Sequence, residues 1–429
     1  MYQYHILPNG LKIVFRQTDS RVAYSGVYIN VGSRDEVAGE EGAAHFIEHS
    51  IFKGTEHRRA YHIQNRIDGV GGELNAFTTK EETCIYASSL SEHIERCLEL
   101  FSDVLFHSVF PEHEIENEKD VVIEEINSYR DQPSDLIFDE FEELVFQGHP
   151  LAHNILGTKK NVKLFTAGFL RSFLTANYTA DRMVLAVVGN IGFDRLVRMA
   201  EKYFGRYGRA GSSPWKRTIQ PIGHGETVIG SGDGRTTSRS IKPVPISIFN
   251  KTVNRHTHQV HLLLGCEAPS LSDERKVAFS LLNNIIGGPA MNSRLNVAVR
   301  EKYGFCYTIE SQYVPFSDTG LFYIYAGVDA DAADRTIGLV MHEIERLQSQ
   351  KLSEQLLRSA QRQYVGQMAI NNDSGLNEMQ SIGKAFMSYD SVDTIEEMAD
   401  DIMAISASDL LDTAVLLPVR ENFSCLCYR

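Results

Sequence analysis

The feature that most constrains this chain is the stretch His45-Phe-Ile-Glu-His49, whose spacing favours a helix. On an α-helix, side chains four positions apart share one face, with about 5–6 Å between their Cβ atoms. Two imidazoles at this spacing can bind one zinc ion. Glu48 lies on the same face, where a general base for a metal-activated water belongs. The alternative is an amphipathic helix that carries two histidines by chance.

The order of these residues is the inverse of the common His-Glu-x-x-His motif and is typical of inverzincins. With this motif the chain resembles the pitrilysin and insulysin family of zinc peptidases, and most closely its short branch with the mitochondrial processing peptidase and bacterial relatives. The resemblance implies a third zinc ligand at Glu125 and a supporting carboxylate two helical turns earlier, at Glu118. A further family position falls on Asp135, where the processing peptidases have Glu, so the role of Asp135 stays open.

A strand is expected at Glu73-Leu-Asn-Ala-Phe-Thr-Thr79, after the glycine-rich turn 69–72. The resemblance implies that this strand is an exposed sheet edge to which a peptide substrate adds through main-chain hydrogen bonds. Asn75, Ala76 and Phe77 are then the substrate-binding positions. The alternative is an ordinary strand in which Asn75 closes a turn.

The order of strands and helices in residues 23–125 recurs after a segment rich in Gly, Ser, Thr and Arg at 205–239. The second copy lacks His-x-x-Glu-His, which indicates a duplicated, metal-free half. We therefore expect a zinc-binding catalytic half at residues 1–222 and a homologous metal-free half at residues 223–429.

Arg300 and Tyr307 follow the turn Gly287-Gly-Pro289, in which Pro289 interrupts the usual glycines. The resemblance implies that this pair stabilises the developing oxyanion or holds peptide carbonyls. From the residues alone, Arg300 is a surface cation on a helix and Tyr307 a half-buried strand residue.

The resemblance implies an α+β fold of two homologous halves, each an antiparallel sheet with helices packed on one side, facing each other as a clam shell. It implies a zinc endopeptidase with one Zn²⁺ per chain that cuts unfolded peptides or leader sequences.

Two other functional classes stay open. One is a non-catalytic subunit, and the other is a partner-dependent subunit of a heterodimer. Zinc ligands and the Arg/Tyr pair on one chain favour a homodimer or a self-sufficient monomer.

Composition narrows the class of protein. The chain of 429 residues is too long for one typical core, and its formal net charge of −14 argues against nucleic-acid binding. Residues 112–143 include thirteen Asp or Glu residues. These form either a solvated helix face or the wall of a substrate chamber that prefers basic peptides. No apolar run approaches the roughly 20 residues of a membrane span, and Met1–Phe15 does not resemble a signal peptide. The six cysteines form no Cys-x-x-Cys pair, which favours a reducing, cytoplasmic location.

Overall fold

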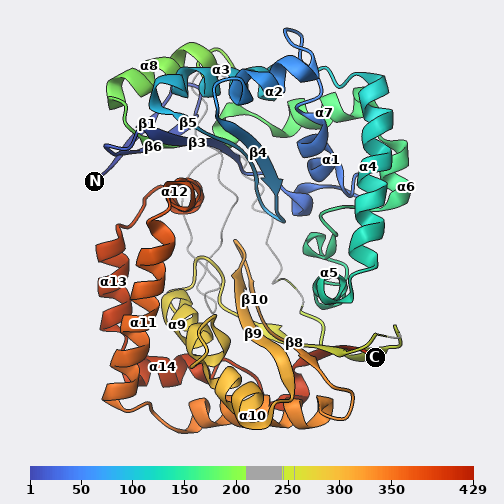
Figure 1. Cartoon of the computed structure of the whole chain (residues 1–429), viewed down its shortest axis with the longest axis vertical. Coiled ribbons are helices and arrows are strands. Elements are labelled where there is room, and N and C mark those ends of the chain that lie inside the picture. Colours follow the sequence, from blue (N-terminus) through green and yellow to red (C-terminus); the bar gives the residue numbers. More distant parts are fainter. Residues whose placement is uncertain (209–243, 245, 256) are drawn as a thin grey trace, which may run out of the picture. The chain divides into compact units, whose positions relative to one another are not determined.

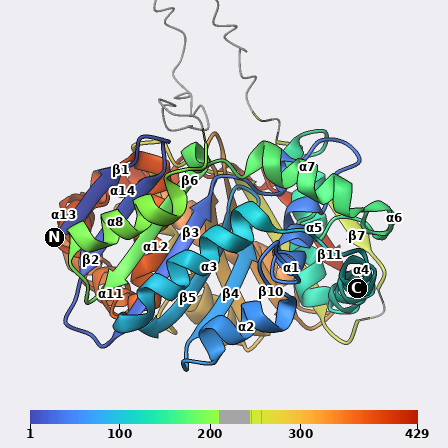
Figure 2. The ribbon, with the colours of Figure 1, turned by 90° about the horizontal axis from the view of Figure 1, so that it is seen from above.

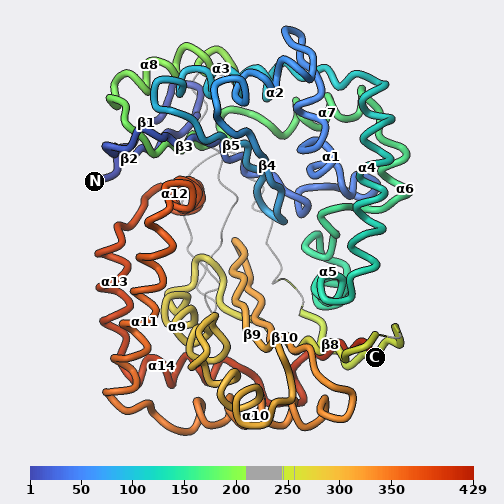
Figure 3. Tube along the Cα trace, in the orientation of Figure 1, coloured from blue at the N-terminus to red at the C-terminus, as the bar shows by residue number. Residues whose placement is uncertain are grey.

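The computed structural model describes residues 1–208, 244, 246–255 and 257–429, which form two compact units (Figures 1 and 3). Unit 1 contains the described parts of Met1–Gln132, Pro150–Lys216 and Gly366–Met398. Unit 2 contains the described parts of Pro133–His149, Arg217–Val365 and Ala399–Arg429. The expected boundary between residues 222 and 223 and most of the segment 205–239 lie outside the described residues, so the boundary stays a prediction.

Unit 1 is built on a six-stranded sheet. Its strands in spatial order are β1 (Tyr2–Ile6), β2 (Lys12–Gln17), β6 (Met183–Gly189), β3 (Val22–Ile29), β5 (Thr83–Leu90) and β4 (Glu73–Thr78). All neighbours are antiparallel except β2 and β6, which run parallel. The strand expected at residues 73–79 is therefore β4, and it lies at a sheet edge.

Helices cover one face of this sheet (Figure 2). They include α1 (Ala43–Ser50), α2 (Ala60–Asp68), α3 (Ile94–His107), α4 (Glu112–Arg130), α6 (Lys159–Leu164), α7 (Ala167–Asn177) and α8 (Phe193–Phe204). Alternate strand residues such as Ile13, Val27 and Leu185 point into this core, as the two-residue period of a strand requires. Among these helices α3 is amphipathic, and its Leu98, Phe101 and Leu105 are fully buried.

The opposite face of the unit 1 sheet is covered by a helix from far along the chain, α12 (Gly375–Tyr389). Met379, Ile382 and Phe386 pack against residues of the central strands, among them Val14 and Tyr28. Glycines allow the close approach. A Cβ at Gly383 would lie 2.5 Å from the Tyr28 ring, and one at Gly375 would lie 2.5 Å from the Tyr24 ring.

Ion pairs surround this apolar contact. Lys12 Nζ lies 2.5 Å from Asp390, and Lys384 Nζ lies 3.2 Å from the buried Glu82 carboxylate. Arg16 pairs with Glu378. Because the Lys12 side chain is only 3% exposed, removal of its partner would leave a buried charge without compensation. The ion pairs therefore fix where α12 lies on the sheet.

Unit 2 contains a five-stranded sheet. Its strands in spatial order are β7 (Asn250–Val253), β11 (Ser424–Tyr428), β8 (Val260–Glu267), β10 (Gly320–Val328) and β9 (Cys306–Pro315). Only β7 and β11 are parallel. One face packs on α9 (Lys276–Gly287), α10 (Ala333–Ser349), α14 (Ala407–Ala414) and part of α11 (Glu354–Asn372).

The other face of the unit 2 sheet is covered by α5 (Pro133–Val145), which comes from the first half of the sequence. The Phe138 ring packs at a tilt near Tyr323 and Tyr325, with ring centroids 5.2 and 5.3 Å away, and Phe141 packs over Gly265. Each unit thus takes one helix from the sequence half that builds the other. Sequence periodicity did not predict this exchange.

The α+β class and the two sheets with helices packed on one side are confirmed. The sheets differ from expectation in that each has one parallel pair and each has a helix on its second face. The facing arrangement of the halves stays a prediction. Within the described part of the chain, no helix is both long and apolar enough to cross a membrane.

Substitution of Gly383 by Ala tests the docking of α12. The new methyl group would meet Tyr28 at 2.5 Å and Ala186 at 3.1 Å, so we expect a loss of about 1–3 kcal/mol of stability and a lower Tm. Gly338→Ala in α10 is the control, because its Cβ would meet nothing within 4 Å and Ala favours the helix. Equal Tm values for Gly383→Ala and the wild type would mean that α12 is only loosely packed.

Candidate metal centre

Helix α1 carries the His-x-x-Glu-His sequence and is held by its apolar face. Phe46 and Ile47 are fully buried in the unit 1 core. The opposite side carries His45 and His49, whose ring centroids lie 4.6 Å apart. Helix α1 lies against both α4 and the edge strand β4. The two histidines therefore point away from the core, between a helix and a strand.

His45, His49 and Glu125 are brought together, with one ligand atom from each within 4.8 Å of the others. Glu125 Oε2 lies 3.7 Å from His45 Nε2 and 3.3 Å from His49 Nε2. Three ligands at about 2.0–2.1 Å from a tetrahedral zinc ion would lie roughly 3.3–3.4 Å apart. The side chains are thus already near the spacing that one such ion requires.

The donor chemistry also fits zinc. Glu125 Oε2 is buried and, within the described part of the chain, has no hydrogen bond of ordinary geometry; it forms an ion pair with His49 Nε2 at 3.3 Å, which a metal ion bound to both atoms would replace. Two imidazoles and one carboxylate form a known catalytic zinc set, which leaves a fourth position open. Among the described residues, no other group of three His, Cys, Asp or Glu side chains has this arrangement.

The two histidines differ in their protonation. Burial lowers the pKa of His45 to about 4, assisted by the nearby His49. Burial also disfavours charge on His49, but Glu118 and Glu125 outweigh it and raise the pKa of His49 to about 9. At pH 7 His45 is therefore neutral and ready to bind a metal, whereas His49 must first lose a proton.

Glu118 supports His49 from the side away from Glu125. Its Oε1 lies 2.9 Å from His49 Nδ1, and its Oε2 lies 2.6 Å from Lys53 Nζ. Burial opposes ionisation, but the bonds to His49 and Lys53 outweigh it and lower the pKa of Glu118. A carboxylate on the second ring nitrogen orients an imidazole toward a metal. Lys53 was missed in the sequence, although its four-residue spacing from His49 was visible.

Glu48 lies beside this group without being one of the three ligands. Burial raises the pKa of Glu48, and the Thr78 hydroxyl and the His49 ring oppose the rise. Thr78 is the last residue of β4, so Glu48 lies near both His49 and the end of the edge strand. A carboxyl group with a raised pKa binds a proton more readily, as a general base at neutral pH should.

The three predicted substrate-binding residues lie on β4 but do not share a face. Ala76 packs toward the helix-covered core, while Phe77 lies on the opposite face, 6.1 Å from the Tyr28 ring. Asn75 is exposed. This alternation follows from the strand period, so a peptide paired along β4 would contact these residues mainly through their main chain.

Arg300 and Tyr307 belong to unit 2 and contact each other. The Arg300 guanidinium lies 5.3 Å from the centre of the Tyr307 ring. Both stand on irregular backbone. Arg300 is in a π-helical turn, Asn296–Glu301. In β9, Thr308 pairs with Gly327 and Cys306 with Val328, so Tyr307 is the extra residue of a β-bulge and is 78% exposed.

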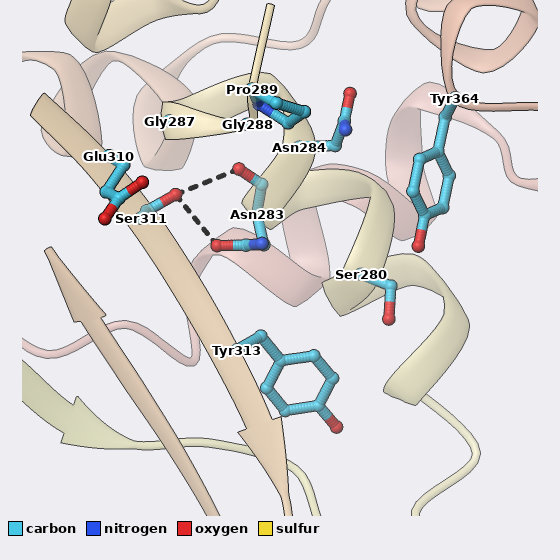
Figure 4. A pocket seen from close by; sticks show the side chains of 10 residues that line it. All are labelled: Ser280, Asn283, Asn284, Gly287, Gly288, Pro289, Glu310, Ser311, Tyr313 and Tyr364. Carbon is cyan, nitrogen blue, oxygen red and sulfur yellow. Dashed lines mark hydrogen bonds between the residues drawn. The ribbon is translucent and has the colours of Figure 1, made fainter. Parts of the chain in front are cut away.

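The turn that precedes this pair lines a small pocket of about 210 Å³ (Figure 4). A Cβ at Gly287 would lie 2.6 Å from the backbone nitrogen of Ser311, so only glycine fits where the turn meets β9. The Ser311 hydroxyl donates to Asn283 at the end of α9. Pro289 follows in the same turn and also lines the pocket. Asp135, whose role stayed open, is on α5 and belongs to unit 2.

Comparisons with known protein families agree with this geometry. Residues 12–159 match the family described as insulinase (peptidase family M16). Residues 165–364 match the domain described as the peptidase M16 inactive domain. The first match contains His45, His49 and Glu125, and the second contains Arg300 and Tyr307.

Individual relatives match over most of their length. An uncharacterized zinc protease of Bacillus subtilis is 32% identical over 407 residues, which cover 95% of this chain and 93% of the relative. An uncharacterized zinc protease of Streptomyces coelicolor is 32% identical, with 94% and 84% covered. Among solved structures, a protease from Helicobacter pylori has a TM-score of 0.85 at 20% identity, with 100% of this chain and 99% of that chain covered. A peptidase M16 inactive domain from Pseudomonas fluorescens has a TM-score of 0.87 at 18% identity, with 100% and 97% covered.

Zinc binding at pH 7 is expected to release about one proton, because His49 with a pKa of about 9 is protonated and His45 with a pKa of about 4 is not. Calorimetric titration in two buffers with different ionisation enthalpies measures this number. Zinc affinity should rise about tenfold per pH unit between pH 6 and 9.

A matched pair of variants on α4 tests the cause. Glu118→Gln removes the anion beside His49, so the proton release at pH 7 should fall below one. Glu116→Gln is the control, since Glu116 is largely exposed and pairs with Lys119. A release near zero in the wild-type protein would show that His49 is not the protonated ligand.

Proposed function

Because this chain belongs to the insulinase family of peptidases, peptidase family M16, we propose that it is a zinc-dependent endopeptidase for unfolded peptides or leader sequences. The observation that carries the proposal is the convergence of His45, His49 and Glu125 beside Glu48. In this proposal residues 1–222 form the catalytic half and residues 223–429 the metal-free half.

His45, His49 and Glu125 would hold one zinc ion per chain. When bound, zinc supplies Lewis-acid chemistry, lowering the pKa of a water molecule toward about 7 and polarising the scissile carbonyl. Glu48 takes the proton from the attacking water and returns it to the leaving amine. Its raised pKa supports both steps, since the same carboxyl must accept a proton and later donate it.

The substrate is proposed to add to β4 as a further strand. Three observations support this arrangement: β4 ends the sheet, it lies against α1, and its last residue Thr78 neighbours Glu48. Recognition by main-chain hydrogen bonds tolerates many sequences, and a folded domain offers no free strand of the needed length. Asn75, Ala76 and Phe77 would bind the substrate, with Asn75 and Ala76 closest to the scissile bond.

Arg300 and Tyr307 are proposed to stabilise the developing oxyanion or to hold peptide carbonyls. Their backbone supports a functional role, because π-helical turns and β-bulges occur frequently at functional sites and re-aim side chains. An exposed tyrosine on a bulge and an arginine stacked beside it provide two hydrogen-bond donors on one surface.

A non-catalytic or partner-dependent subunit of a processing-peptidase-like complex is the second candidate. The inactive-domain match of residues 165–364 is the observation that favours it. Zinc content together with peptide turnover by the isolated chain decides between the candidates. We propose a homodimer, with a heterodimer as the alternative, in a cytoplasmic location. The mass of the purified active species tests the proposed oligomeric state.

Glu48→Gln should keep zinc and peptide binding while turnover falls by about 10²–10⁴, because only proton transfer is lost. Glu125→Gln should instead lower zinc affinity, since it removes charge from a ligand. Zinc stoichiometry and kcat measured on both variants separate the two roles. Loss of zinc from the Glu48→Gln protein would make Glu48 a ligand rather than the base.

Tyr307→Phe should lower kcat by about 10²–10³ with little change in zinc content or KM, because the lost hydrogen bond forms mainly as the oxyanion develops. Tyr303→Phe is a matched control, since Tyr303 is also exposed but stacks on Phe305. Arg300→Ala should raise KM if Arg300 holds carbonyls in both ground and transition states. Wild-type kcat in Tyr307→Phe would restrict the chemistry to the first half.

A further inference from the structure

The start of α1 is capped by a buried carboxylate that is far from the usual capping position. Glu36 is 2% exposed. Its Oε2 accepts a hydrogen bond from the Gly42 backbone N–H and its Oε1 accepts one from the Ala44 backbone N–H, both at 2.9 Å. Across the ranges that the structure describes, Glu36 pairs with no basic side chain. Both of its oxygens are therefore committed to one helix end.

The usual cap is sterically excluded at this helix. Gly42 occupies the N-cap position with φ 95°, in the left-handed region, and has no side chain to offer. A Cβ there would lie 2.8 Å from the Gly157 Cα and the Leu156 carbonyl oxygen. Residues that normally cap helices cannot replace Gly42. The helix thus depends on Glu36 for acceptors at two of its first N–H groups.

Glu36 is itself fixed from the side of the edge strand. The turn Ser33–Asp35 before it bonds to the turn that follows β4: Ser33 N–H donates to the Thr79 carbonyl at 3.2 Å and Arg34 N–H donates to the Lys80 carbonyl at 2.9 Å. The Arg34 guanidinium lies 2.5 Å from Glu81. A continuous chain of short contacts therefore runs from the end of β4 through Glu36 to α1.

We propose that Glu36 is a positioning residue that sets the placement of α1, and thereby of His45 and His49, relative to Glu125 and β4. It acts through the helix and touches neither the metal site nor the substrate strand directly. His45 is only three residues from the capped Gly42, so a shift of the first turn moves His45 directly. The inference rests on the metal-ligand roles proposed above.

The physical basis is the orientation of two acceptors. Acceptors at a helix N-terminus are stabilised by the unpaired N–H groups and by the helix dipole. Burial raises the pKa of Glu36, and the two N–H donors oppose this rise because they stabilise the carboxylate form. Each N–H group bonds to its own oxygen, so the cap requires two acceptor oxygens. Glutamine has the same size but only one acceptor, because its NH₂ group can only donate.

Glu36→Gln is the test. Glu40→Gln is the control on the same loop, because the partly exposed Glu40 carboxylate accepts a hydrogen bond from the Val37 N–H and, among the described residues, none from α1. We expect the zinc affinity of Glu36→Gln to fall about 10–100-fold, as for other residues that orient ligands. The visible absorption of the Co²⁺-loaded protein should change in intensity and position, because it reports ligand geometry. Glu40→Gln should match the wild type in both measurements.

If folded Glu36→Gln keeps the wild-type cobalt spectrum and zinc affinity, the proposal is wrong. A lower Tm of the metal-free variant would not rescue it, because a residue with a purely structural role lowers Tm without changing metal binding. If Glu36→Gln does not fold, Glu36→Asp decides. Asp is one methylene shorter and cannot span both N–H groups, so unchanged zinc affinity there also refutes it. Neither measurement uses peptide turnover. A wild-type protein that cuts no peptide would contradict the proposed function and leave this inference standing.

Discussion

The packing of α1 against α4 is the constraint on which the candidate metal centre depends. Phe46 and Ile47 of α1 and Val122 and Ile126 of α4 belong to one core. This packing leaves the polar faces of the two helices side by side. Histidines and a glutamate that are far apart in sequence are thereby held at 3.3–3.7 Å. Burying these polar side chains costs desolvation energy. The charges of Glu118 and Lys53 offset part of this cost, and a bound cation would offset more of it.

The exchange of helices between the two halves follows from the need to cover both faces of a sheet. Each half of the sequence places its own helices on one face only, which leaves apolar residues such as Val14 and Tyr28 on the other. Helix α12 covers that second face in unit 1, and α5 covers it in unit 2. Compact units and duplicated sequence halves are therefore not the same thing in this protein.

The candidate functional residues of the two units stand on different kinds of backbone. In unit 1 the proposed metal ligands lie on two regular helices, and their side chains converge because these helices pack together. In unit 2 the half-buried Arg300 and the exposed Tyr307 stand on a π-helical turn and a β-bulge, beside a glycine turn that packs directly on β9. Local backbone irregularity is costly and is retained where it aims a side chain, which is consistent with the roles proposed for this pair.

The sequence by itself determined the elements and the candidate ligands. Helical spacing alone placed His45, Glu48 and His49 on one face, because a helix repeats with a fixed period. The resemblance to the family singled out Glu118 and Glu125, because the order of motifs along the chain can be read from the sequence. Only the tertiary structure decided what lies across space: the distances to Glu125, the place of α12 on the second face of the sheet, and the cap that Glu36 supplies to α1. These contacts join residues without a fixed sequence offset, so no period along the chain encodes them. They arise because apolar faces must be covered and buried N–H groups must be paired, wherever along the chain the partner lies.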